Sequence, residues 1–177
     1  MKDQIEIPLS KKKLILMFIG SMGFVMAGLW LVIKPPTISN PFFGNPPIIL
    51  LSGLASVMFF GLCAVYIARK LPDNKPGLII DKIGLTDNSS GISAGQILWS
   101  DIENISVLEM HRQKLILLQV INPKDYIDKQ SNGFKRKMMQ LNFNMYGTPL
   151  SINSNSLIIK FDDLLNTLND KLNASRH

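Results

Sequence analysis

LILMFIGSMGFVMAGLWLVI (residues 14–33) and IILLSGLASVMFFGLCAVYIA (residues 48–68) contain no charged side chain, and these two stretches decide the architecture of the chain. At about 1.5 Å per residue, a helix of about twenty residues spans the roughly 30 Å hydrocarbon core of a bilayer. Because a backbone in lipid must satisfy its own hydrogen bonds, each stretch is predicted to be a transmembrane helix. The sequence therefore predicts a membrane helical hairpin, with residues 76–177 left to form one soluble α+β domain.

The charges that flank the apolar stretches predict their orientation. Three lysines precede the first stretch at positions 11–13, and Arg69 and Lys70 follow the second, whereas the connector of residues 34–47 holds one lysine. The positive-inside rule places both termini, including the segment of residues 1–13, in the cytoplasm and the connector outside. The expected localisation is therefore the cell inner membrane, as a multi-pass protein. Five prolines predict that the connector is a stiff, extended loop without helix.

Small residues in both stretches predict where the two helices contact each other. Gly23 and Ala27 lie four residues apart in the first stretch, and Ser52 and Ser56 have the same spacing in the second. Small side chains at this spacing let two helix backbones approach closely. A contact within the hairpin is the favoured interpretation and a homodimer face is the alternative, so the oligomeric state stays open. Neither stretch contains Asp, Glu, Lys, Arg or His, which argues against an ion or proton pathway.

The N-terminal segment has the period of a β-strand. Ile5, Ile7 and Leu9 alternate with polar residues, and Pro8 interrupts one face. Because proline lacks an N–H group, such a strand must lie at the edge of a sheet. We therefore expect this segment to add an edge strand to the sheet of the soluble domain. A solvated lead-in to the first helix is the alternative.

The soluble domain begins with short apolar runs that have strand character. They recur about every ten residues, which favours an antiparallel sheet or barrel over βαβ units. The runs are residues 78–81, 85–87, 96–99, 105–108 and 115–121.

A helical period follows these strands. Asn122 before Pro123 is a typical helix opening, and the stretch up to position 146 is either one helix or two helices divided at Gly133. Residues 150–152 resume as a strand, and a closing amphipathic helix begins at Phe161. The predicted apolar face of the first helical stretch consists of Ile127, Phe134, Met138, Leu141 and Met145.

Several of these features resemble known bacterial proteins. The hairpin of residues 78–87 and the strand and turn of residues 97–102, in a β-rich body closed by a helix, resemble the bacterial pleckstrin-homology-like (PH-like) domains. The whole chain is similar to an uncharacterised bacterial family of two-transmembrane-helix proteins with such a cytoplasmic domain, through residues 5–13, 122–123 and 146–149. The resemblance implies a PH-like antiparallel β-barrel or sheet with an inserted helix and a C-terminal helix. It implies no activity.

Composition and residue pattern argue against an enzyme, a metal site and a nucleic-acid partner. Residues 69–177 hold 14 Lys and Arg against 11 Asp and Glu, a net charge of +3, which is too weak for a nucleic-acid-binding stripe. His111 is predicted at a hairpin tip, with no second histidine or cysteine to complete a ligand set. Trp99 is expected in the core, with a ligand-stacking ring as the alternative. We therefore expect no catalytic residue, no metal and no cofactor.

The densest basic cluster of the soluble domain is the candidate functional site. An ordinary solvated helix face is the favoured interpretation of Lys135, Arg136 and Lys137, because charge runs usually mean solubility. The alternative is that they face the anionic inner leaflet, where each contributes about 1 kcal/mol. The expected function is a membrane-tethered, non-enzymatic interaction module whose domain binds a protein partner or the surface of the lipid bilayer. An accessory subunit of a larger membrane complex, held through the helical hairpin, is the alternative, and a membrane-anchored hydrolase is a remote one.

Overall fold

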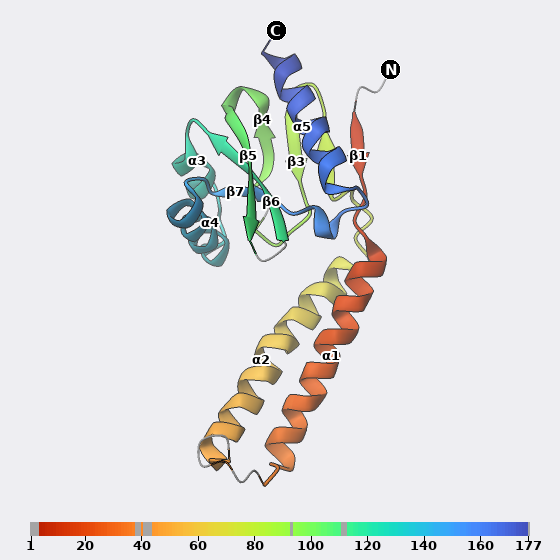
Figure 1. The fold of residues 1–177 in the computed structure, drawn as a ribbon, viewed down its shortest axis with the longest axis vertical. Helices are drawn as coiled ribbons and strands as arrows, with labels where there is room; N and C mark the ends of the chain where they lie inside the picture. Colours follow the sequence, from red (N-terminus) through yellow and green to blue (C-terminus); the bar gives the residue numbers. More distant parts are fainter. Residues whose placement is uncertain (1–3, 38–39, 41–43, 93, 111–112, 177) are drawn as a thin grey trace. The chain divides into compact units, whose positions relative to one another are not determined.

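The computed structural model describes residues 4–37, 40, 44–92, 94–110 and 113–176 (Figure 1). The chain divides into two compact units. One unit is a helix pair within Lys11–Asn74, and the other is a sheet domain formed by Met1–Ser10 together with Lys75–His177. The sheet domain is therefore discontinuous in sequence, because the helix pair is inserted after its first strand.

The helix pair consists of α1 (Lys11–Ile33) and α2 (Pro46–Lys70), which pack against each other. Both helices are long and apolar enough to cross a membrane, as predicted. The connector ends earlier than predicted, because Pro46 and Pro47 occupy the first positions of α2. The first N–H groups of a helix have no intrahelical partner, so proline is tolerated there.

The contact between α1 and α2 differs from the predicted one by one residue in each helix. Gly28 and Gly53 make the closest approach: a Cβ on Gly28 would lie 2.9 Å from the carbonyl oxygen of Gly53, and a Cβ on Gly53 would lie 2.8 Å from that of Gly28. Of the predicted residues, only Ser56 takes part, and its Oγ donates to the carbonyl of Phe24 at 3.0 Å. The other three, Gly23, Ala27 and Ser52, are exposed.

The reason for this difference is that each helix carries more than one set of small residues. A shift of one position turns the contact by about 100° around a helix axis, so spacing alone does not choose between the sets. Aromatic packing supports the observed choice, because the rings of Phe24 and Phe60 are stacked with centroids 4.3 Å apart.

The first sheet of the domain is antiparallel, with the strand order β1-β2-β3-β4. Its edge strand β1 (Ile5–Ile7) confirms the strand predicted in the N-terminal segment. The other strands are β2 (Leu78–Ile80), β3 (Gly84–Asp87) and β4 (Gly95–Leu98).

The second sheet has the order β5-β6-β7 and is also antiparallel. It consists of β5 (Ile102–Met110), β6 (Gln113–Val120) and β7 (Leu150–Ile152), and the 3-10 turn η1 (Trp99–Asp101) joins it to the first sheet. The α+β class is therefore confirmed. Within the described residues neither sheet closes, so a PH-like barrel is not confirmed.

The segment after β1 is also bonded to the C-terminal part of the domain. The carbonyl of Pro8 accepts a hydrogen bond from Ile158 N at 2.9 Å, and Ser10 N donates to the carbonyl of Ser156 at 2.8 Å. Between them, Leu9 forms a β-bridge with Leu157. The N-terminal segment therefore contacts two parts of the folded domain. Strand β1 pairs with β2, and the residues after β1 bond to residues 156–158.

The core of the domain forms where α5 (Phe161–Ser175) lies against the strands (Figure 1). The helix buries a stripe of Leu164, Leu168 and Leu172. Trp99 lies in this core as expected, and its indole N–H donates to the carbonyl of Asp81 at 2.9 Å. The satisfied indole explains why a buried tryptophan is stable at this position.

We predict that Gly28→Ala destabilises the helix pair. The added methyl group meets the backbone oxygen of Gly53, which cannot move aside as a flexible side chain can. Overpacking of this kind costs about 1–3 kcal/mol. The measurement is the free energy of unfolding of the purified protein in a titration from mild to denaturing detergent, followed by circular dichroism.

Gly23→Ala is the matched control, because a Cβ at that position meets no atom within 4 Å. It makes the same chemical change in the same helix and should leave the unfolding free energy unchanged or slightly higher, since alanine is the better helix former. Equal destabilisation by both substitutions would contradict the Gly28–Gly53 contact.

Candidate functional site

The candidate site lies on the helical segment between β6 and β7. This segment forms two helices, α3 (Pro123–Asp128) and α4 (Gly133–Tyr146), so the alternative with a division at Gly133 is confirmed. The Asn132 side chain caps α4 by accepting hydrogen bonds from the first N–H groups, at 2.9 Å from Phe134 N and 3.2 Å from Lys135 N. Gly147 ends the helix in the left-handed conformation, with φ 75°.

The buried face of α4 is not the predicted one. Met139 is fully buried, whereas Phe134, Leu141 and Met145 are 70%, 41% and 61% exposed. Only Ile127 of α3 is buried as predicted. The reason is that α4 carries two apolar stripes, and the period of the sequence fits either of them. Packing on the sheet selected the stripe that contains Met139, and the predicted stripe was left at the surface.

The three basic residues of the predicted cluster do not share one face. Consecutive helical residues point about 100° apart. Lys135 is half-buried and lines a groove beside the first sheet. Arg136 donates from Nη2 to the carbonyls of Asp128 and Gln130, each at 3.2 Å. It therefore ties α4 to the end of α3, and Lys137 lines a separate groove between these helices.

The groove beside the first sheet is the basic feature that the structure assembles. It has a volume of about 400 Å³, and its lining includes Lys75 from the segment before β2, Asp87 and Asn88 at the end of β3, and Lys135 from α4. Lys75 comes five residues after Lys70, the last residue of α2. Two lysines from distant parts of the sequence therefore line one groove. Lys75 was not identified from the sequence. The feature that could have identified it is its position five residues after the second apolar helix.

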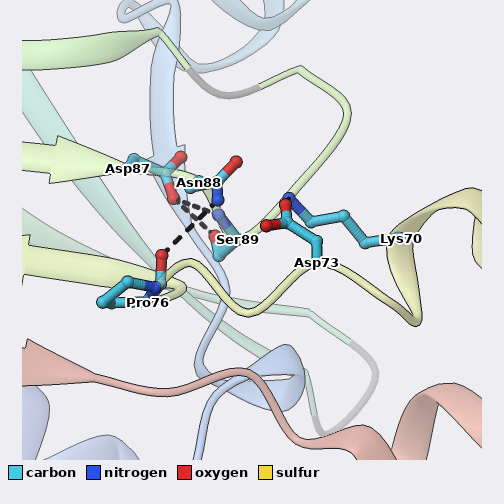
Figure 2. A network of polar contacts seen from close by, with 6 residues as sticks. All are labelled: Lys70, Asp73, Pro76, Asp87, Asn88 and Ser89. Atoms are coloured by element: carbon cyan, nitrogen blue, oxygen red, sulfur yellow. Dashed lines mark hydrogen bonds and ion pairs between the residues drawn. The ribbon is translucent and has the colours of Figure 1, made fainter.

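The floor of this groove is held by a turn after β3. Asp87 is buried, and its carboxylate accepts hydrogen bonds from Ser89 N at 2.8 Å and Ser89 Oγ at 2.6 Å. Figure 2 shows this turn, with the side chain of Asn88 directed to the carbonyl of Pro76. Asn88 N also donates to the carbonyl of Gly77 at 2.8 Å, so the turn holds the chain that enters β2. The same figure shows the ion pair of Lys70 and Asp73 that follows α2, at 2.9 Å.

The groove between α3 and α4 has a more apolar lining. Its volume is about 450 Å³, and Ile127 and Leu141 contribute apolar surface while Arg136 and Lys137 contribute the positive charge. A polar network fixes α3 beneath it. The hydroxyl of Tyr126 donates to Asp101 Oδ2 at 2.6 Å, which joins α3 to η1. Burial, and next the bond to Asp101, raise the pKa of Tyr126 above its ordinary value.

The described residues show no group of three His, Cys, Asp or Glu side chains that could hold a metal ion. Asp162 and Asp163 are exposed in the first turn of α5, where the helix dipole favours acidic side chains. Cys63 lies on α2. The predicted hairpin tip at His111 lies outside the described residues.

We predict that Tyr126→Phe destabilises the domain by about 1–3 kcal/mol near neutral pH, because the half-buried Asp101 carboxylate loses a hydrogen-bond donor. The folded state raises the pKa of Tyr126, so the stabilisation is complete below the ordinary value near 10 and is lost as the pH rises above it. The measurement is urea unfolding of the protein in micelles at pH 8, 10 and 11. The wild type should lose stability over this range, and the variant should lose less.

Tyr146→Phe on α4 is the control for the loss of a tyrosine hydroxyl. It should keep the pH dependence of the wild type. The same pH dependence in Tyr126→Phe and in the wild type would show that the Tyr126–Asp101 bond is not its source.

Comparisons with protein-family models, with curated proteins and with solved structures find no match for this chain. The structure itself shows a pair of helices that could span a membrane, followed by an antiparallel sheet domain with helices.

Proposed function

We propose that this protein is a membrane-tethered, non-enzymatic interaction module that rests its sheet domain on the anionic surface of the membrane spanned by α1 and α2. The observation that carries the proposal is the groove that Lys75 and Lys135 line together. The tether supplies the proximity, and the basic side chains select which face of the domain meets the lipid.

Covalent connection limits how far this groove can lie from the headgroups. Lys75 follows the last residue of α2 by five positions, and an extended chain covers at most about 3.6 Å per residue, or about 18 Å in all. Lys135 lines the groove with Lys75 and is therefore held near the same end of the domain. The flanking charges predict that the domain lies on the cytoplasmic side, so the leaflet within this reach is the inner one.

The expected strength of the contact is modest. A lysine close to an anionic surface contributes about 1 kcal/mol, so Lys75 and Lys135 together contribute about 2 kcal/mol, or about thirtyfold in the ratio of docked to undocked domains. That is too little to hold a free protein on a membrane. It is enough to orient a domain that two helices already hold there, because tethering replaces a bimolecular step by an intramolecular one.

An accessory subunit of a larger membrane complex is the second candidate, and the exposed surface of α1 favours it. Gly20 and Gly23 have open space beside them, and Ala27 is exposed. A second helix could approach closely along this surface. Exchange of Gly23 and Ala27 for leucine would weaken such an assembly without touching the Gly28–Gly53 contact.

We predict that individual lysines become protected from an amine-reactive reagent when the full-length protein sits in anionic vesicles. Labelling of Lys75, Lys135 and Lys137 should be slower in phosphatidylglycerol vesicles than in neutral phosphatidylcholine vesicles, by up to about thirtyfold for the docked domain. The protection should fall at high salt, since the Debye length shrinks to about 3 Å at 1 M. Mass spectrometry of peptides gives the rate at each lysine.

Lys82, Lys160 and Lys171 are the internal controls, because they lie elsewhere on the same domain and experience the same vesicles. Lys82 and Lys171 line a different pocket with Trp99. Uniform slowing of all six lysines, or protection that ignores salt, would contradict docking through the groove.

A further inference from the structure

An apolar stripe of α4 lies largely at the surface of the domain. Phe134, Leu141 and Met145 are exposed large side chains, and the half-buried Met138 lies among them. At about 100° per residue, these four positions fall within about 60° of the helix circumference. The stripe is therefore continuous along α4, on a flank of the helix that does not contain the buried Met139.

The charges of α4 surround this stripe in a specific way. The helix contains three basic residues and no acidic one. On the helical wheel, Lys137 borders the stripe on one side and Lys135 lies beyond it on the other. Gln140 and Arg136 project from the remaining surface, away from the stripe. An apolar stripe between two lysines is the pattern of a helix that lies in a membrane interface, where long side chains reach the phosphates.

Lys135 links this stripe to the tethered end of the domain. It lies beyond the Met138 edge of the stripe on α4, and it lines the groove with Lys75. Lys75 follows the end of α2 by five residues, so α4, which lines the same groove, stays within reach of a bilayer that α2 spans.

We propose that α4 inserts Phe134, Leu141 and Met145 into the interfacial region of an anionic bilayer, with Lys135 and Lys137 at the level of the phosphates. This inference rests on the proposed function and adds a second interaction with the membrane. Apolar side chains of α4 enter the bilayer interface, in addition to the lysines that contact its anionic headgroups. A second copy of α4 fits the stripe less well, because it would place three positive charges opposite three others with no acidic residue on either helix.

The test uses the full-length protein in vesicles, with Cys63→Ala to remove the native thiol and one new cysteine for an environment-sensitive dye. Met145→Cys places the dye in the stripe, and Gln140→Cys places it on the polar side of the same helix. Both positions are exposed, so the labels disturb no packing. Lipids that carry nitroxides at the headgroup and at two acyl depths report the depth of each dye by quenching.

The expected result is a blue-shifted dye at Met145, about 5–10 Å below the phosphates, and a dye at Gln140 that is shallower by about 5 Å or more. The depth at Met145 should decrease when Phe134→Ser and Leu141→Ser are added. Because Phe134 and Leu141 are exposed, these variants should fold, and unchanged unfolding by urea confirms it.

The outcomes separate this inference from the proposed function. Equal, shallow quenching at both positions, with protection of Lys75 and Lys135 intact, overturns insertion and leaves surface docking in place. A blue shift at Met145 without lipid quenching shows that a protein surface covers the stripe, and it overturns insertion as well. Quenching at Met145 with protection of Lys135 and Lys137 but not of Lys75 supports insertion and overturns docking through the groove.

Discussion

The pairing of β1 with β2 is the constraint on which the rest of the chain depends. It joins the two segments that flank the helix pair, because Ile7 lies opposite Leu78 in the antiparallel register. The chain therefore leaves the domain and returns to it at neighbouring points. Hydrogen bonds of Pro8 and Ser10 with the C-terminal part of the domain fix the point at which it leaves. In the proposed membrane-tethered arrangement, only an even number of crossings would return both ends of the inserted segment to one side. Two helices are the smallest solution, and they agree with the charge flanks that predict a common side for both termini.

The parts of the structure that sequence predicts well are those in which one physical requirement dominates. A twenty-residue stretch without charge satisfies lipid only as a helix, so its identity does not depend on tertiary contacts. The N-terminal strand is similar: the alternation of Ile5 and Ile7 and the missing N–H of Pro8 together require an edge position, which β1 has. The ends of elements were less predictable. Pro46 begins α2 because the start of a helix needs no N–H there, a local exception that composition does not reveal.

The candidate site was harder to predict. The apolar period of a sequence shows that a helix has a buried face, but it does not show which residues form that face. Met138 and Met139 are adjacent, so α4 fits the sheet with either of two stripes inward, and the surrounding shape decided for Met139. The same ambiguity shifted the contact between α1 and α2 to Gly28 and Gly53. The groove with Lys75 could not be found from spacing at all. Its two lysines are 60 residues apart and meet only because the sheet and α4 fold against each other.

A tether at two points changes what a membrane surface interaction must achieve. A domain on a single flexible linker can rotate freely, and choosing one face then costs much of the weak electrostatic attraction. Here the chain leaves the domain after Ser10 and returns at Lys75, next to strands that pair with each other, so the domain is joined to the helix pair at two neighbouring points. Under the proposed function, the contribution of about 2 kcal/mol from Lys75 and Lys135 would orient a domain that is already held at the membrane. The proposal also accounts for the exposed apolar stripe of α4, because a surface held near lipid can keep side chains that would cause aggregation in a protein free in solution.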